Sequence, residues 1–424
     1  MKLETIALHH GYESEKTTKA ATTPIYQTSS FTFDNTQHGA DLFDLKVEGN
    51  IYTRIMNPTN AVLEQRVAEM EGGIASLALA SGMAAITASI QCITQAGDNI
   101  VSTNQLYGGT YNLFAHTFPQ QGINVKMVDA GDFDAIDSAI DDKTKALYCE
   151  SIGNPLGNIV DLKELATIAH RHNIPLIVDN TVPTPYLCKP FDFGADVVIH
   201  SLTKYIGGHG TTIGGIIVDS GKFDWAKEPK KYPMLNEPDP SYHGVVYTEA
   251  LGPAAFIGRC RVVPLRNTGA ALSPNSAFLI MQGLETLGLR MERHCDNALA
   301  LAKFLESHEQ VDWVNYGALP NDKYNANCKK ITQGKASGII SFGITGGIKA
   351  GTKFIDALQI ILRLVNIGDA KSLACHPAST THRQLNPEEL KAAGVSEDMV
   401  RISVGIEHID DIISDVKQAL EAAK

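Results

Sequence analysis

Short apolar runs alternate with helical patterns from residue 75 to residue 218, and this alternation restricts the fold more than any other feature of the chain. The apolar runs are typical of buried strands and lie at 75–80, 99–103, 124–128, 145–150, 175–179, 196–200 and 212–218. Helical periodicity predicts helices at 82–95, 108–118, 132–140 and 161–172. Strands that alternate with helices form a mostly parallel, doubly wound sheet with both faces covered. Chemistry is therefore expected at the carboxyl ends of the strands.

The regions that flank this segment have different patterns. Residues 1–60 are rich in Thr, His, Asn and Gly and predict an extended arm, and residues 60–71 predict an amphipathic helix. Residues 220–270 predict a long, partly helical excursion. We expect three parts: an arm at 1–60, a main domain at 61–265 and a smaller α/β domain at 266–424.

Within the C-terminal part, Pro274 to about His308 predicts one long helix or two stacked ones. Strands are expected at 337–344 and 399–406, and helices at 347–360, 387–393 and 408–423. The helix at 387–393 would begin at Asn386-Pro387-Glu388-Glu389, which combines a cap, a proline in the first turn and acidic residues.

Composition excludes several classes of protein. The formal net charge is −11, the pI is about 5.7 and no basic run of five is present, which argues against binding to nucleic acid or to an anionic membrane. Seven scattered cysteines without a C-x-x-C pair predict reduced thiols in the cytoplasm. The N-terminus lacks an apolar signal core. Residues 72–97 are uncharged but are interrupted by polar residues, which favours a strand, a turn and a helix over a membrane span.

Metal and nucleotide motifs have little support. His170 and His172 are two residues apart and therefore point to different faces of a helix, and no H-E-x-x-H is present. We therefore expect no metal. Neither a P-loop motif nor a G-x-G-x-x-G motif follows a predicted strand, so sites for mononucleotides and dinucleotides lose their main support.

A lysine and an aspartate each follow one of the predicted strands. Asp179 ends the run at 175–179, and Lys204 comes after the run at 196–200 and before Gly207-Gly208. A surface lysine and an aspartate that caps the next turn are the alternatives. However, buried Asp is costly unless it is paired. Pyridoxal 5′-phosphate (PLP) requires an amine that forms a Schiff base and a carboxylate against its pyridine nitrogen. The pair predicts a PLP site.

Other residues near the predicted strand ends fit the phosphate and the ring of this cofactor. In an extended segment, Ser201 and Thr203 lie on one face and present two hydroxyls. The turn Ser81-Gly82-Met83 begins a helix, whose first N–H groups can bind an anion. Tyr107 follows the strand at 99–103 and could stack on a planar ring. Each signal also fits an ordinary turn residue or a half-buried tyrosine.

Four motifs, in order along nearly the whole chain, resemble the Cys/Met-metabolism family of PLP enzymes. They are Tyr52-Thr53-Arg54-Ile55-Met56-Asn57-Pro58-Thr59, Ser81-Gly82-Met83-Ala84, Ser201-Leu202-Thr203-Lys204-Tyr205-Ile206-Gly207-Gly208-His209 and Arg401-Ile402-Ser403-Val404-Gly405-Ile406-Glu407. The resemblance implies the family's PLP-dependent transferase fold of type I, with PLP bound to the domain at 61–265.

The resemblance also implies a role for each motif residue. Lys204 would carry PLP as a Schiff base, Asp179 would pair with the pyridinium nitrogen and Tyr107 would stack on the ring. The other cofactor-binding positions would be Asn154 at the ring hydroxyl, Gly82, Met83, Ser201 and Thr203 around the phosphate, and Ser81 and Thr181. Tyr52 and Arg54 would reach the phosphate of a neighbouring subunit, which implies active sites shared across a dimer, usually within a tetramer. Arg401 would bind the substrate α-carboxylate.

One stretch departs from the pattern of the family's γ-synthases and lyases. Asn366-Ile367-Gly368-Asp369-Ala370-Lys371-Ser372-Leu373 stands where those members have Ser-x-Gly-Gly. This form, the segment His376–His382 and the excursion at 220–270 are similar to O-acetylhomoserine sulfhydrylases. How Asn366 helps Arg401 to hold the substrate stays open.

The resemblance implies γ-replacement on O-acetyl-L-homoserine by sulfide, which gives homocysteine for methionine synthesis, with Lys204 as the base and Tyr107 as a second acid–base group. A γ-lyase or a cystathionine γ-synthase-like enzyme, a PLP-free Schiff-base enzyme and a non-enzymatic binding protein are the alternatives. The acyl group and the sulfur donor, including methanethiol, cysteine or a sulfur-carrier protein, also stay open.

Overall fold

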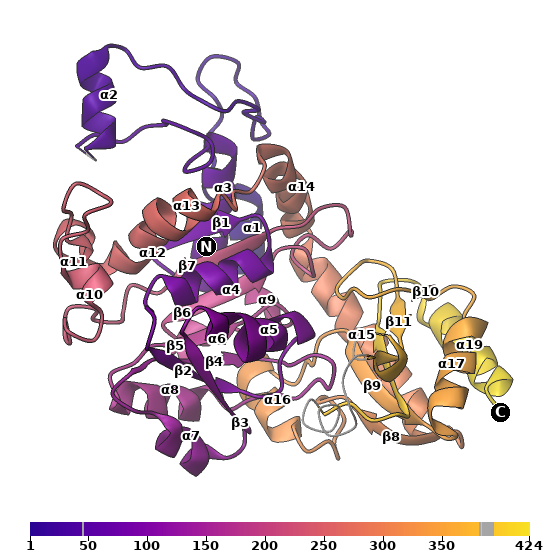
Figure 1. The fold of residues 1–424 in the computed structure, drawn as a ribbon. Helices are drawn as coiled ribbons and strands as arrows, with labels where there is room; N and C mark the ends of the chain where they lie inside the picture. Colours follow the sequence, from indigo (N-terminus) through magenta and orange to yellow (C-terminus); the bar gives the residue numbers. More distant parts are fainter. Residues whose placement is uncertain (45, 381–382, 384–393) are drawn as a thin grey trace. The chain divides into compact units, whose positions relative to one another are not determined.

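The computed structural model describes residues 1–44, 46–380, 383 and 394–424 (Figure 1). These residues divide into two compact units. The first unit comprises Met1–Thr94, Ile199–Thr203 and Thr211–Glu285. The second comprises Gln95–Val198, Lys204–Gly210 and Thr286–Lys424. The candidate residues are thus divided, with those for the phosphate in the first unit and Lys204 in the second.

Seven strands form one sheet in the order β1-β7-β6-β5-β4-β2-β3. They are β1 (Ala75–Leu79), β2 (Asn99–Thr103), β3 (Asn124–Val128), β4 (Thr144–Glu150), β5 (Leu176–Asp179), β6 (Val197–Ser201) and β7 (Gly215–Asp219). β2 pairs in parallel with β3 and β4, and β4 pairs in parallel with β5, whereas β7 is antiparallel to β1. The predicted mostly parallel sheet is confirmed, and each predicted strand is present.

Helices connect these strands as expected. They are α4 (Gly82–Gln91), α5 (Gly108–Asn112), the π-helical turn η1 (Leu113–Thr117), α6 (Phe118–Gln120), α7 (Phe133–Ala139), α8 (Leu162–Arg171), α9 (Thr184–Leu187) and η2 (Pro190–Phe193). α8 buries Leu162, Leu165 and Ile168 against β4 and β5, and Asp161 caps it by accepting hydrogen bonds from two backbone N–H groups. In the first unit, α4 packs against β1 and β7.

The prediction of an extended arm at 1–60 is wrong in two places. α1 (Leu3–His9) buries Ile6 and Ala7 and packs against α3 (Pro58–Glu71), which is the helix predicted at 60–71. α2 (Thr36–Phe43) begins after Asn35, whose side chain accepts a hydrogen bond from the backbone N–H of His38. Both helices are short, so they show too few turns for a clear periodic signal.

The excursion at 220–270 is partly helical, as predicted. It contains α10 (Pro233–Asn236), α11 (Tyr247–Leu251), η3 (Gly252–Ala254), α12 (Ala255–Cys260), the π-helical turn η4 (Arg261–Leu265) and α13 (Arg266–Thr268). The region from Pro274 forms two helices rather than one, α14 (Pro274–Glu285) and α15 (Leu287–Glu306). Thr286 separates them with a non-helical backbone.

A second sheet lies in the C-terminal part, with the order β10-β11-β12-β9-β8. The strands are β8 (Val311–Asn315), β9 (Ile339–Ile344), β10 (Leu362–Arg363), β11 (Leu373–Cys375) and β12 (Met399–Ser403). α17 (Gly347–Ala357) and α19 (Ile409–Ala422) lie side by side next to it, and α15 packs against β8 and β9 (Figure 1). The sequence did not predict β8, β10, β11 or α16 (Asn325–Thr332), because these elements are short and lack a clean alternation.

Some predictions concern residues outside this description. The helix predicted at 387–393 and its start at Asn386 lie outside the described residues. A 3-10 turn, η5 (Pro377–Ser379), forms part of the segment that begins at His376. Among the helices of the described ranges, none combines the length and the apolar character that a membrane span requires.

Candidate active site

Lys204 lies in the turn that follows β6, and glycine and arginine fix the shape of this turn. The Gly208 N–H donates to the Lys204 carbonyl oxygen at 2.7 Å, and Gly208 has a φ of 70°. Arg290 of α15 donates to the carbonyl oxygens of Tyr205 and Ile206 at 2.7 and 3.2 Å. A Cβ on Gly208 would come within 2.2 Å of the Arg290 Nη1 atom. The position therefore requires glycine, and the backbone that carries Lys204 is held on both sides.

Hydrogen bonds connect four of the predicted residues, Lys204, Asn366, Arg401 and Asn154. Lys204 Nζ donates to Asn366 Oδ1 at 2.5 Å. Arg401 donates from Nη2 to the main-chain oxygen of Asn366 and from Nη1 to Asn154 Oδ1, both at 3.0 Å. Arg401 is buried, and its Nε has no hydrogen-bond partner among the described residues. Asn366 thus connects Lys204 to Arg401, and the Arg401 Nε is a donor that a ligand could use.

The surroundings of Lys204 favour its unprotonated amine. Burial, followed by the positive charge of Arg401, lowers the Lys204 pKa from 10.5 to about 8. A buried ammonium loses its hydration, and a neighbouring cation adds repulsion, so both effects disfavour the charged form. A larger fraction of Lys204 is then a nucleophile near neutral pH than of an exposed lysine.

Covalent attachment of PLP to the cofactor-free protein is therefore expected to accelerate as the pH rises through about 8. Only the unprotonated amine can attack an aldehyde, so the rate should follow the amine fraction of Lys204. Stopped-flow absorbance from about pH 6.5 to about pH 10 measures this dependence. Replacing Arg401 by Ala should move the midpoint upward, because it removes the repelling charge. A wild-type midpoint above pH 10, as for an exposed lysine, would contradict this electrostatic account.

Asp179 and Glu150 end neighbouring strands and are directly opposite one another in the pairing of β4 with β5. Asp179 Oδ1 accepts a hydrogen bond from the Thr181 N–H at 3.0 Å, so this carboxylate also caps the following turn. Glu150 Oε1 accepts from the backbone N–H of Tyr107 at 2.6 Å, which ties the segment before α5 to the end of β4. Burial and then the charge of Asp179 raise the Glu150 pKa well above its usual value. Tyr107 itself is exposed, and its ring remains accessible to a ligand.

The predicted anion-binding turn is present at the start of α4. Ser81 Oγ accepts a hydrogen bond from the Ala84 N–H at 3.0 Å and so caps the helix. The N–H groups of Gly82 and Met83 come before it and have no carbonyl partner within the helix. A Cβ on Gly82 would lie 2.7 Å from the Ser201 Cβ, so only glycine allows α4 to begin against the end of β6. The turn and Ser201 form a cradle of the kind that a phosphate occupies.

The reason given for grouping Ser201 with Thr203 is wrong. β6 ends at Ser201, and Thr203 lies in the following turn rather than in an extended strand. Thr203 Oγ1 accepts from the Gly214 N–H at 3.1 Å and donates to the Gly214 carbonyl at 3.3 Å. β6 lies one residue later than the predicted strand at 196–200, and the extended segment assumed for 201–203 is absent because the turn that carries Lys204 begins directly after Ser201.

Tyr52 and Arg54 lie on the surface of the first unit. The Arg54 guanidinium is 5.5 Å from the centre of the Tyr52 ring, and its Nη1 donates to the Arg266 carbonyl oxygen at 2.6 Å. Tyr52 is 40% exposed. Both side chains therefore remain available to a neighbouring molecule, and their predicted contact with another subunit stays a prediction.

Sequence reasoning missed three buried charged or titratable groups around these strand ends. Glu150 ends the apolar run at 145–150 in the same manner as Asp179 ends its own, so that signal could have found it. Arg290 lies in the first turns of a long helix, α15, and gave no local signal. His200, directly before Ser201, is fully buried, and its Nε2 lies 2.6 Å from Glu71 Oε1.

Metal binding finds no support in the part of the chain that the structure describes. No group of three or more His, Cys, Asp or Glu side chains that could hold a metal is found there. His170 pairs instead with Asp196 at 2.8 Å, and His172 pairs with Asp137 at 2.7 Å. These contacts give both histidines a structural role.

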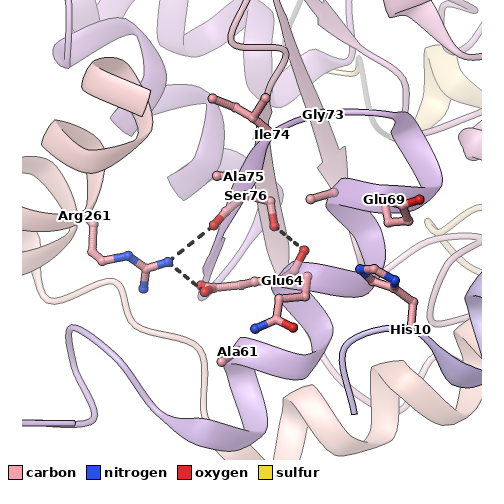
Figure 2. A pocket seen from close by; sticks show the side chains of 11 residues that line it. His10, Ala61, Glu64, Glu69, Gly73, Ile74, Ala75, Ser76 and Arg261 are labelled. Carbon is pink, nitrogen blue, oxygen red and sulfur yellow. Dashed lines mark hydrogen bonds and ion pairs between the residues drawn. The ribbon is translucent and has the colours of Figure 1, made fainter. Parts of the chain in front are cut away.

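A cavity of about 290 Å³ in the first unit contains none of the predicted site residues (Figure 2). Figure 2 shows Arg261 pointing toward Glu64, with a distance of 2.7 Å between Arg261 Nη2 and Glu64 Oε2. Arg261 also donates to the Ser76 carbonyl oxygen at 3.3 Å, and Glu64 Oε1 accepts from the Ala78 N–H at 2.8 Å. Arg261 and Glu64 thus form an ion pair with one another, and nothing in the cavity indicates a ligand.

Comparison with known protein families gives a match over almost the whole chain. A family model described as Cys/Met metabolism PLP-dependent enzyme matches residues 4–421. A homocysteine synthase of Schizosaccharomyces pombe is 50% identical over 421 residues, which cover 99% of this chain and 98% of the relative. An O-acetyl-L-homoserine sulfhydrylase of Leptospira meyeri is 50% identical over 429 residues, which cover 99% of this chain and 97% of the relative.

The fold is also similar to that of a solved structure. A crystal structure described as an O-acetylhomoserine (thiol)-lyase from Campylobacter jejuni has a TM-score of 0.97 and 42% identity to this chain. The match covers 99% of this chain and 100% of the other. That protein carries a pyridoxyl-lysine phosphate residue.

Proposed function

The chain belongs to the Cys/Met-metabolism family of PLP-dependent enzymes, and from this membership we propose that it is an O-acetyl-L-homoserine sulfhydrylase. It replaces the acetyl group of O-acetyl-L-homoserine by sulfide and so forms homocysteine and acetate for methionine synthesis. The arrangement of Lys204, Asn366 and Arg401 carries this assignment, because it presents a base beside an anchor for a carboxylate.

The described residues fit PLP. The start of α4 lies against Ser201, and the N–H groups of Gly82 and Met83, which have no carbonyl partner within the helix, support a phosphate there. Lys204 would hold the cofactor covalently, Asp179 would lie against its pyridine nitrogen and Asn154 would bind its ring hydroxyl. Tyr107 and Thr181 would contact the ring, and the phosphate would be held by Ser81, Gly82, Met83, Ser201 and Thr203. Bound PLP supplies an electron sink for negative charge that develops on the substrate.

The protein's own groups position the substrate and move its protons. Arg401 holds the substrate α-carboxylate with its remaining N–H groups, which fixes the orientation of the Cα–H bond. The lowered Lys204 pKa allows its Nζ to take the Cα proton, and Asn366 Oδ1 then receives a hydrogen bond from the resulting ammonium. Tyr107 is the candidate to move a second proton near the acetate that leaves Cγ. Sulfide forms the new bond at Cγ.

Active sites shared between two subunits explain the exposure of the N-terminal region. Tyr52 and Arg54 lie on the surface, and large apolar side chains of the same region are also exposed, among them Phe33, Phe43 and Val47. Exposed apolar surface of this kind favours association. We assign residues 1–60 to contact with a neighbouring subunit, 61–265 to the PLP-binding domain and 266–424 to the C-terminal domain, within a dimer-based tetramer. The seven cysteines are free and buried, which supports the cytoplasm as the location.

Mixing two inactive variants is expected to restore activity if Arg54 completes a neighbouring site. A hybrid dimer of Arg54→Ala and Lys204→Ala has one site with both lesions and one intact site. Random exchange of subunits should therefore restore about a quarter of the wild-type turnover. The matched control mixes Lys204→Ala with Asp179→Asn, whose lesions both fall in the site of their own subunit, and should restore nothing. No gain in the first mixture, with exchange verified by mass spectrometry, would contradict the sharing of sites.

The proposed activity is tested by steady-state turnover of O-acetyl- and O-succinyl-L-homoserine with sulfide, methanethiol and cysteine. The largest kcat/KM is expected for the acetyl ester with sulfide. Cleavage of cystathionine without turnover of either ester would contradict the proposal and would favour the lyase alternative.

A further inference from the structure

We propose that Glu150 is a positioning residue that holds Tyr107 and Asn154 on two sides of the bound PLP ring. This inference rests on the proposed function, because it concerns the cofactor that Lys204 would hold. Glu150 lies at the end of β4 and is 5% exposed. Its role has to be sought in what its carboxyl group binds, because water has little access to it.

The Glu150 carboxyl group binds the backbones of both neighbouring loops. Its Oε1 accepts from the Tyr107 N–H at 2.6 Å, and the carboxyl group also accepts a hydrogen bond from the Asn154 N–H. Tyr107 begins the segment that continues into α5, and Asn154 lies in the loop after β4. One side chain thus fixes two loops that are far apart in sequence. The hydrogen bond from Tyr107 to Glu150 spans 43 residues, whereas Asn154 lies just after Glu150.

The two loops carry residues with complementary tasks. Tyr107 would cover the face of the ring, and Asn154 would bind its hydroxyl while Asn154 Oδ1 accepts from Arg401. A shift of either backbone would tilt the ring or would disturb the anchor of the substrate carboxylate. Cofactor geometry should therefore depend on the hydrogen bonds that the Glu150 carboxyl group accepts from these two backbones.

The position of Glu150 beside Asp179 adds an electrostatic condition. The two residues are partners in the β4–β5 ladder. Burial, and then the Asp179 charge, raise the Glu150 pKa well above its usual value, because both disfavour the charged form of the Glu150 carboxyl group.

The test compares Glu150→Ala and Glu150→Gln by two measurements that do not depend on turnover. These are the Kd of PLP in titrations of the cofactor-free protein and the visible circular dichroism of the holoenzyme, which reports the tilt of the ring. Glu150→Ala removes the acceptor of the Tyr107 and Asn154 N–H groups and should raise the Kd about tenfold or more and change the dichroism. Glu150→Gln keeps one acceptor oxygen and should fall between wild type and Glu150→Ala.

Asp415→Asn is the matched control. Asp415 is as buried as Glu150, and its two oxygens accept from the backbone N–H groups of Gln359, Ile360 and Ile361 at 2.9 Å. Its replacement should lower the unfolding midpoint without altering the PLP Kd or the dichroism. If Glu150 only stabilised the fold, its replacement would have the same effect as that of Asp415: a lower unfolding midpoint with unchanged PLP Kd and dichroism.

Two outcomes overturn the proposal. The first is a Glu150→Ala protein with wild-type Kd and dichroism and a lowered unfolding midpoint. The second, which decides the matter if Glu150→Ala does not fold, is a Glu150→Gln protein that equals wild type in both measurements. Failure of the proposed function is distinguishable, because a wild-type protein that binds PLP and forms no homocysteine contradicts that function alone.

Discussion

Replacing Lys204 by Ala is expected to lower turnover of O-acetyl-L-homoserine by at least about 10³-fold. The variant loses the amine that bonds to the cofactor and the group that moves the Cα proton. Its Asn366 and Arg401 partners remain, so substrate should still bind. Steady-state kinetics and reduction with borohydride measure the two losses separately, because only a covalently bound cofactor is fixed to the protein by reduction.

Lys145→Ala is the control for this variant. Lys145 is also a buried lysine of the second unit, and it is paired with Asp98 at 3.4 Å. Its loss should destabilise the fold and leave covalent cofactor attachment intact. A Lys204→Ala enzyme that keeps more than about a tenth of wild-type kcat would contradict the proposal that Lys204 moves the Cα proton.

Replacing Asp179 by Asn is expected to lower kcat on the order of 10³-fold. In the proposed site, the Asp179 carboxylate forms a buried charge pair with the pyridine nitrogen of PLP. The loss of one partner from such a pair costs roughly 3–5 kcal/mol, and each 1.36 kcal/mol changes a rate tenfold. Asn keeps the side-chain oxygen that accepts from the Thr181 N–H, so the turn after β5 should persist. The visible spectrum of the holoenzyme reports the protonation of the cofactor ring and should change with kcat.

Asp161→Asn provides the comparison for this second variant. Asp161 caps α8 through hydrogen bonds from two backbone N–H groups and is placed in no catalytic role. Wild-type kcat is expected for it. An Asp179→Asn enzyme with the wild-type spectrum and kcat would show that Asp179 acts only as the cap of its turn.

The fold could be predicted where the sequence pattern is local and periodic. Strands β1 to β7 each overlap a predicted apolar run, and the buried ones were found because a strand buried on both faces has a continuous apolar sequence. α8 was found for a similar reason, since its apolar stripe and its Asp161 cap are signals within a few residues of one another. By contrast, α1 and α2 are too short for a periodic signal, and β10 has only two residues.

The sequence allowed each candidate residue to be named, but it did not predict which of them would be in contact. The contact between Lys204 and Asn366 joins residues 162 positions apart, and that between Arg401 and Asn154 spans 247. Spacing along the chain contains no information on such contacts. The question of how Asn366 assists Arg401 therefore needed the structure, which shows that the Asn366 main-chain oxygen accepts from Arg401 and its side-chain oxygen accepts from Lys204.

The proposed function depends on replacement of the acetyl group by sulfide rather than on elimination. The products of the reaction distinguish the two directly. Wild-type enzyme with PLP, O-acetyl-L-homoserine and sulfide is expected to form homocysteine and acetate in equal amounts, with neither ammonia nor 2-oxobutyrate. Nuclear magnetic resonance of the reaction mixture quantifies all four products at once. Acetate accompanied by equal amounts of ammonia and 2-oxobutyrate, without homocysteine, would contradict the account.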